Sequence, residues 1–217
     1  MRAVERILGS EPFGEGFLAS GPCDCPTQTT SERRTFVERA DAMQSAVRMG
    51  LLTIPRRHPD FLRLRVLVTL FGGYFGSRLM SNIREDKGYT YGISAMLVPH
   101  PGGSMLVIGS ETTNEWVEPL IAEVYHEIDR LHNDLVSWDE LTMVQNYMTG
   151  EMCRSYESPL SLADAWLYVQ MSGLPDTYFA DALQAVREIT PEEIRHLART
   201  YLCPDQLREV VAGRKIT

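Results

Sequence analysis

The sequence predicts an α+β fold, and three features of its 217 residues lead to this prediction. An alternating segment comes first, a hairpin pattern follows two short helical segments, and a run of helices leads to a closing strand. Because the strands are grouped and do not alternate with single helices, the pattern favours an α+β layer over a βαβ arrangement.

The N-terminal part of the chain differs in composition from the rest. Residues 10–32 are rich in Gly, Pro, Ser and Thr and show no periodicity. Such a composition is typical of a linker or an irregular arm. We therefore expect residues 1–35 to form an arm and residues 36–217 to form the folded domain.

The first strand and the first two helices are expected before residue 89. Residues 40–49 alternate, which predicts a strand with one set of side chains on one face; these are Met43, Ser45, Val47 and Met49. Residues 59–71 are apolar at helical spacing and follow a Pro-Asp start, so we expect a helix that glycines end at residue 72. A second helix is expected to run through Ile83 and to end at Gly88.

A β-hairpin is expected next. Residues 89–98 alternate, and Tyr91, Ile93, Ala95 and Leu97 would then share one face. Residues 99–103 supply turn residues, and residues 105–109 return as the partner strand.

The second half of the chain reads mainly as helices. Three helix starts show a capping-box pattern, in which Ser or Thr precedes Glu by three residues; these are Thr112–Glu115, Ser137–Glu140 and Thr190–Glu193. Residues 160–171 and 178–189 also have helical patterns, and residues 207–213 predict a short final strand.

Composition limits the classes of function. The chain has 21 basic and 29 acidic residues, a net charge of −8, and its basic residues are scattered. Nucleic-acid binding needs clustered positive charge, so we expect no nucleic-acid partner. No apolar run approaches the roughly 20 residues that a membrane span requires. Nothing in the sequence indicates a compartment.

The histidines and cysteines do not form a metal-binding pattern. Neither H-E-x-x-H nor H-x-x-E-H occurs, and His126, Glu127 and His132 place the two imidazoles about 120° apart around a helix. We therefore predict no metal ligands in this chain. Cys23 and Cys25 are separated by one residue, which is poor spacing for a zinc knuckle. Cys153 and Cys203 are expected to be small buried side chains.

The sequence contains no recognisable nucleophile or phosphate-binding loop. No G-x-S-x-G elbow is present. The glycine-rich residues 72–78 follow a helix and lack the G-K-[ST] ending of a phosphate loop. A tight turn between helices explains these glycines.

Arg84 and Tyr91 form the one constellation that indicates chemistry. Arg84 is placed on the last turn of a helix and Tyr91 on the start of the following strand, so the two side chains can converge beside the sheet edge. A guanidinium and a phenol together offer hydrogen-bond donors for a carbonyl oxygen or a carboxylate, with no base or nucleophile. Spacing alone also allows a structural role, with Arg84 paired to nearby acidic residues and Tyr91 half-buried.

The segment around these residues resembles the C-terminal, non-zinc-binding domain of the insulinase–pitrilysin–mitochondrial processing peptidase family of zinc peptidases. The resemblance lies in a Gly-Gly turn, S-R-L, I-R-E-x-x-G and a following Tyr, which here are Gly72-Gly73, Ser77-Arg78-Leu79, Ile83-Arg84-Glu85, Gly88 and Tyr91. Further matches are His58-Pro59-Asp60, Glu140-Leu141, Gly150, Leu174-Pro175 and the start of the last helix at Thr190. The resemblance covers residues 36–217.

The resemblance implies a mostly antiparallel sheet with helices packed on one face. It also implies a partner: a homologous catalytic domain or subunit carries H-x-x-E-H and the zinc, and the two halves close on an extended peptide. This chain would be the non-catalytic half of the endopeptidase, inactive alone, with Arg84 and Tyr91 reaching the substrate. The glycine turn at residues 72–76 lies where some relatives carry a longer gating loop.

Two other functions stay open at this point. Relatives of the fold also serve as scaffold or assembly subunits without peptidase activity. The second alternative is a stand-alone metalloenzyme whose ligands are dispersed along the chain.

Overall fold

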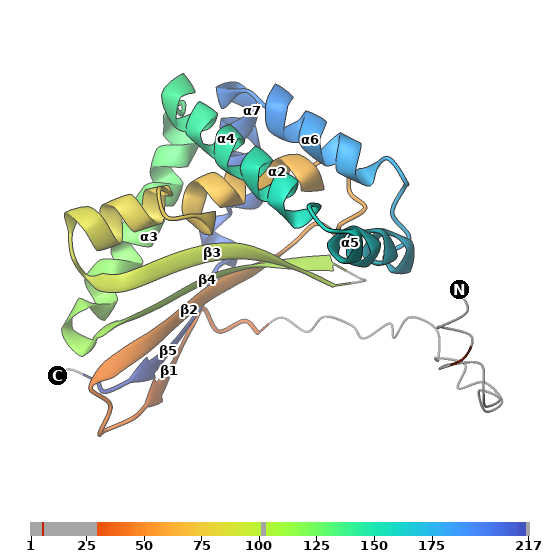
Figure 1. Ribbon diagram of the computed structural model, residues 1–217. Helices are drawn as coiled ribbons and strands as arrows, with labels where there is room; N and C mark the ends of the chain where they lie inside the picture. The colour runs from red at the N-terminus through yellow and green to blue at the C-terminus, as the bar shows by residue number, and fades with distance from the viewer. Residues whose placement is uncertain (1–5, 7–29, 101–102, 216–217) are drawn as a thin grey trace.

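The computed structural model describes Arg6 and residues 30–100 and 103–215. Five strands form one sheet (Figure 1): β1 (Arg34–Glu38), β2 (Gln44–Thr53), β3 (Thr90–His100), β4 (Gly103–Thr113) and β5 (Arg208–Gly213). The helical segments before the hairpin are α2 (Phe61–Val68) and two π-type turns, η1 (Thr69–Gly73) and η2 (Met80–Asp86). The later ones are η3 (Asn114–Trp116), α3 (Val117–Asn133), α4 (Trp138–Ser155), α5 (Pro159–Met171), α6 (Tyr178–Glu188), α7 (Pro191–Tyr201) and η4 (Pro204–Gln206).

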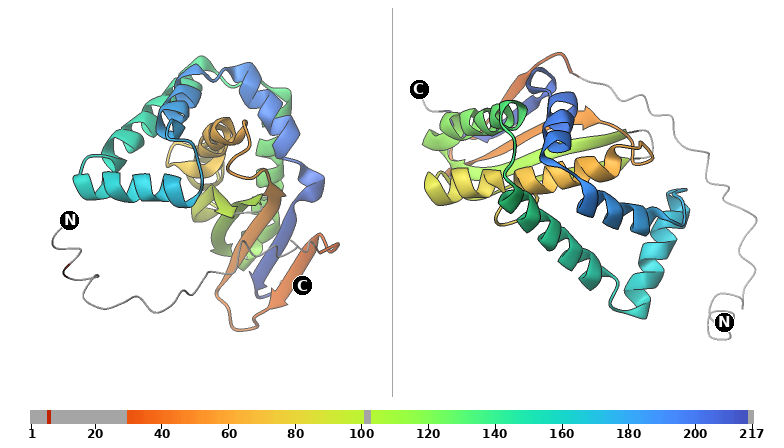
Figure 2. Two further views of the ribbon diagram at one scale, coloured as in Figure 1. Left: turned by 90° about the vertical axis from the view of Figure 1, so that its right-hand side faces the viewer. Right: turned by 90° about the horizontal axis from the view of Figure 1, so that it is seen from above.

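The sheet has the strand order β1-β5-β2-β4-β3. The β1–β5 pair is parallel and the other pairs are antiparallel. The helices pack on one face of the sheet, as Figures 1 and 2 both show. The expectation of an α+β fold with a mostly antiparallel sheet and helices on one face is confirmed.

The core lies between the sheet and the helices. Alternate residues of β2 and β4 point into it, including Val47, Met49, Leu106 and Ile108. They meet apolar side chains from the helical layer, among them Leu67 of α2. Burial of each such side chain contributes about 1.5–3 kcal/mol, so alternation in the strands and helical spacing in α2 together fix which faces meet.

Most expected elements are present, with shifted ends. β2 begins at Gln44, and Met43 lies outside it with 81% of its surface exposed, so the prediction that Met43 lies on one strand face with Ser45, Val47 and Met49 is wrong. The hairpin is confirmed as β3 and β4, although residues 101–102 of its turn lie outside the described residues. β1 was not predicted because it is a short edge strand with only one partner, β5.

The division of the chain at residue 36 stays a prediction. β1 begins at Arg34, two residues inside the expected arm. Residues 1–5 and 7–29, including Cys23 and Cys25, lie outside the described part of the chain. Cys153 is exposed and Cys203 partly exposed, so the prediction that both are buried is wrong.

The three predicted capping boxes have different outcomes. The reciprocal bonds of Thr190 and Glu193 form at the start of α7. At α4, Ser137 accepts the Glu140 amide, but the Glu140 carboxylate binds Arg78 instead of closing the box. Thr112 lies within β4 and caps no helix, so that prediction is wrong: the strand continues because Thr112 pairs with both Ser45 and Thr90.

Candidate functional site

Arg84 lies at the end of η2, where the chain turns into the sheet. Ile83 is fully buried beside it and anchors the turn. Gly88 adopts a φ of 67°, which glycine tolerates and other residues rarely adopt. The Tyr89 amide then donates to the Ile83 carbonyl at 3.0 Å, which closes the turn and starts β3 directly after it. The sequence therefore places Arg84 a few residues from the edge strand.

Tyr91 occupies a β-bulge at the start of β3. Thr90 pairs with Thr112 and Ile93 pairs with Ser110. Two residues of β3 therefore lie between these pairs but only one residue of β4, so β3 contains one extra residue. The extra residue changes the alternation, and Tyr91 is 91% exposed while Ile93 and Ala95 are buried. The prediction that Tyr91 shares a face with Ile93 and Ala95 is wrong for this reason.

Two buried hydroxyl groups hold the bulge. Thr90 Oγ1 donates to the Glu111 carbonyl at 2.6 Å and accepts from the Gly92 amide at 3.1 Å. Ser110 Oγ lies 3.0 Å from both Thr90 Oγ1 and the Gly92 carbonyl. These bonds satisfy backbone groups that the bulge removes from the strand ladder, and so they fix the direction of Tyr91.

Arg84, Tyr91 and Phe75 form one cluster, which we call the Arg84 cluster. The Arg84 Cζ atom lies 4.7 Å from the Phe75 ring centroid and 5.4 Å from the Tyr91 ring centroid. Both distances are in the range of cation–π contacts. The structure thus brings the two predicted side chains together and adds a third, Phe75, which sequence reasoning missed. An aromatic residue inside the glycine-rich turn was the available signal.

The polar atoms of the Arg84 cluster have few protein partners. Among the described residues, neither the Arg84 guanidinium nor the Tyr91 hydroxyl makes a hydrogen bond, and the nearest carboxylate oxygen of Glu85 is 3.9 Å from Arg84 Nη1. The guanidinium stays charged, and its N–H groups and the phenol O–H can donate. The cluster can bind a carbonyl oxygen or a carboxylate, but it contains no base or nucleophile.

A partly buried ion pair links two distant parts of the sequence. Arg78 binds Glu140 with two hydrogen bonds, at 2.7 and 2.9 Å. Burial lowers the pKa of Arg78, but the hydrogen bonds to Glu140 and the negative charge of Glu140 together raise it by more. The net shift of the Arg78 pKa is therefore upward. Arg78 and Glu140 both belong to the resemblance described above, and the pair joins the start of η2 to α4.

Two of the three residues considered for metal binding, Glu127 and His132, have other partners. His132 Nε2 lies 3.0 Å from the Ala198 carbonyl and 3.1 Å from that of Leu202, at the end of α7. The fully buried Glu127 accepts from Asn82 and Arg130. In the described residues, no group of three or more His, Cys, Asp or Glu side chains is arranged to hold a metal ion. The residues do not fit a zinc site.

Comparison with known proteins identifies the class that this fold and site define. The chain belongs to the M16 peptidase family: residues 1–148 match the model of the peptidase M16 inactive domain. This match confirms the family resemblance found in the sequence.

Individual relatives agree with this assignment. The chain is 21% identical over 193 residues to the "probable inactive metalloprotease YmfF" of Bacillus subtilis, covering 88% of this chain and 44% of the relative. It is 26% identical over 158 residues to the "uncharacterized zinc protease YmxG" of the same organism, covering 73% and 37%. The chain thus spans less than half the length of these relatives.

A solved structure supports the fold. The peptidase M16 inactive domain from Pseudomonas fluorescens superposes with a TM-score of 0.79 at 24% identity, covering 86% of this chain and 44% of that one. Among the described residues, no helix is both long and apolar enough to cross a membrane.

Proposed function

We propose that this chain is the non-catalytic half of a zinc-dependent endopeptidase of the pitrilysin–insulinase type. It forms one wall of a chamber that binds an extended peptide, and a homologous domain or subunit completes the chamber. Zinc and its H-x-x-E-H ligands are assigned to that catalytic half. The inactive-domain match and the relatives that are about twice as long support this proposal.

The observation that carries the proposal is that the donors of the Arg84 cluster make no hydrogen bond to a described residue, although Arg84 Nη1 lies at ion-pair distance, 3.9 Å, from Glu85. The Arg84 guanidinium lies over the Tyr91 ring, and neither it nor the phenol hydroxyl makes a hydrogen bond to a described residue. In a chamber that excludes water, such donors stabilise a peptide carbonyl or a developing oxyanion more strongly than they would in water. We infer that Arg84 and Tyr91 donate to the substrate backbone and that Phe75 positions Arg84.

The test uses this chain combined with the H-x-x-E-H-containing homologue from the same genome. Arg84→Ala should lower kcat/KM for a fluorogenic peptide about 100-fold, and Tyr91→Phe about 10-fold, because each removes a donor to the substrate. Arg84→Lys should give an intermediate loss, since it keeps the charge but loses the planar donor set. The melting temperature should stay unchanged in all three variants.

Arg154→Ala is the matched control, because Arg154 lies on α4 with its side chain 73% exposed. It should leave kcat/KM unchanged. Full activity of both Arg84→Ala and Tyr91→Phe would contradict the role of the pair. Absence of any activity or association with the homologue would instead favour a scaffold subunit of the same fold.

A further inference from the structure

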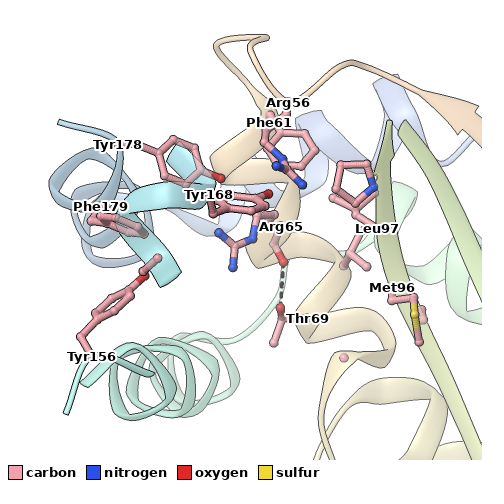
Figure 3. Close-up of a pocket in the computed structure, with 15 residues that line it drawn as sticks. Arg56, Phe61, Arg65, Thr69, Met96, Leu97, Tyr156, Tyr168, Tyr178 and Phe179 are labelled. Atoms are coloured by element: carbon pink, nitrogen blue, oxygen red, sulfur yellow. Dashed lines mark hydrogen bonds between the residues drawn. The ribbon is translucent and has the colours of Figure 1, made fainter. Parts of the chain in front are cut away.

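A second polar site lies in a hollow of about 520 Å³ between α2, α5, α6 and the end of β3. Figure 3 shows Arg56 and Arg65 facing this space together with Tyr168 and Tyr178. We call it the Arg56–Arg65 hollow. Its volume is within the range of small-molecule sites. The Arg84 cluster does not line it.

Two guanidinium groups line the hollow without a carboxylate. No Asp or Glu is among the described residues that line it, and neither Arg56 nor Arg65 forms an ion pair within the described part of the chain. Arg56 packs with its Cζ atom 4.1 Å from the Tyr168 ring centroid and donates to Ser172 Oγ at 3.0 Å. Arg65 makes no side-chain hydrogen bond to a described residue. In a chain of net charge −8, this is a local excess of positive charge.

The electrostatic environment favours an added negative charge. Burial lowers the pKa of the Arg56 guanidinium, and the nearby Arg65 lowers it further against an opposing effect of Tyr178. Two like charges in a partly desolvated hollow repel each other, and a bound anion would relieve this repulsion. Burial also raises the pKa of Tyr156, which keeps its hydroxyl a hydrogen-bond donor.

Tyrosine hydroxyls add further donors. Tyr178 is 7% exposed as a whole residue, and its hydroxyl, which is not among the buried polar atoms, makes no hydrogen bond to a described residue. Figure 3 shows this hydroxyl on the side of the ring that faces the hollow. Tyr156 and Tyr168 also line the space. These hydroxyls can donate to an acceptor that enters the hollow.

The remaining walls are apolar. Phe61, Val68, Leu97 and Phe179 line the hollow beside the donors. The Arg56–Tyr168 contact covers one face of that guanidinium and Ser172 takes one of its N–H donors, which leaves other edge donors for a planar acceptor. A ligand that joins a carboxylate to an aromatic or apolar group would match both the hydrogen-bond donors and the apolar walls of the hollow.

We infer that the Arg56–Arg65 hollow binds a carboxylate attached to an aromatic or apolar group, such as the C-terminal carboxylate of a peptide that ends in Phe or Leu. Arg56, Arg65 and Tyr178 donate to the carboxylate oxygens, and the ring and aliphatic walls hold the body. That the carboxylate belongs to a peptide rests on the proposed function; that the hollow binds a carboxylate does not.

Calorimetric titration of the full chain with small probes tests the inference. N-acetyl-phenylalanine should bind, and its amide should bind at least tenfold more weakly, because it lacks the charged acceptor. Equal binding of the amide, or no binding of the carboxylate, would overturn the assignment.

Variants of the full chain place the probe in the hollow. Arg65→Gln should weaken binding of N-acetyl-phenylalanine about tenfold without changing the fold, since Arg65 makes no side-chain hydrogen bond to a described residue. Tyr178→Phe should weaken it less, and Arg154→Gln should have no effect. Binding unchanged in both Arg65→Gln and Tyr178→Phe would show that the carboxylate binds elsewhere.

A peptide probe separates this inference from the proposed function. An octapeptide ending in Phe should bind with a free C-terminus and lose affinity as the C-terminal amide. If the small carboxylate binds and the peptide does not, the site stands and its peptide assignment is wrong; loss of both probes overturns the site itself. Neither result depends on peptidase activity.

Discussion

Arg84 packs against two aromatic rings and makes only a long ion pair with Glu85, and this arrangement decides what it can bind. A close ion pair would neutralise the guanidinium and occupy its donors. Contacts with Phe75 and Tyr91 contribute about 0.5–1 kcal/mol at an exposed site and leave the N–H edge free. The sequence alone allowed pairing with neighbouring acidic residues, and Arg84 does form an ion pair with Glu85, but at 3.9 Å this contact is too long to be a hydrogen bond.

The hydroxyl of Thr90 should matter more than its position at the strand end suggests. Thr90→Val removes a group that bonds both the Glu111 carbonyl and the Gly92 amide. We expect a loss of about 1–3 kcal/mol in the free energy of unfolding, because buried polar groups lose their partner. Chemical denaturation measures this loss, and the reconstituted activity should also fall, because Tyr91 loses its fixed direction.

Thr113→Val is the control for that substitution. Thr113 is an exposed threonine near the end of β4, and the change should alter stability by less than about 0.5 kcal/mol. Equal stability of both variants would mean that the bulge does not need the hydroxyl of Thr90.

At the scale of elements, close packing of η1 against β3 determines where the glycine-rich turn lies. A Cβ atom at Gly72 would lie 2.6 Å from Ala95 Cβ and 2.7 Å from the Ala95 backbone nitrogen. The strand backbone cannot yield to such contacts. The glycines explained from sequence as a tight turn therefore also allow the turn to touch the edge strand that carries Tyr91.

Two glycine substitutions should have opposite effects on stability. Gly72→Ala should lower the free energy of unfolding by about 1–3 kcal/mol through overpacking. Gly150→Ala in α4 should raise it by about 0.5–1 kcal/mol, since no atom lies within 4 Å of the added Cβ and alanine favours the helix. Thermal or denaturant unfolding of the two variants measures both effects. A stable Gly72→Ala variant would contradict the packing described for η1.

The capping boxes show the limit of local patterns. Ser158 and Ser161 form a reciprocal cap at the start of α5. The S/T-x-x-E pattern does not predict this cap, because its third helical residue is Ser and not Glu. Thr112–Glu115 fits the search but belongs to β4, because pairing with two neighbouring strands outweighs a local cap. Local signals predict helix starts well only where no strand partner competes.

At the scale of the whole molecule, the sequence predicted the layer and its main elements because their periodicity is strong. The strand pair β1–β5 was not predictable, since parallel pairing joins residues near both ends of the chain and leaves no local signal. The pairing of Arg84 with Tyr91 was partly predictable from their spacing. The bulge was not predictable, because it depends on the register between β3 and β4, and the aromatic residue in the glycine-rich turn was the only sequence signal for Phe75.

The Arg56–Arg65 hollow is also a property of the whole fold. Its residues come from the loop before α2, from α2, and from α5 and α6, and their separation in sequence gives no motif. Only the packing of these helices beside the end of β3 brings two unpaired arginines together.

The central claim is that this chain contributes a chamber wall while the metal and its ligands belong to another module. The most direct test is to titrate the H-x-x-E-H-containing homologue with this chain and to measure peptide cleavage and bound zinc. The account predicts saturable stimulation of cleavage at equimolar ratio, with one zinc per pair and neither zinc nor hydrolysis for this chain alone. Chelator-sensitive cleavage by the isolated chain, with stoichiometric zinc, would contradict it.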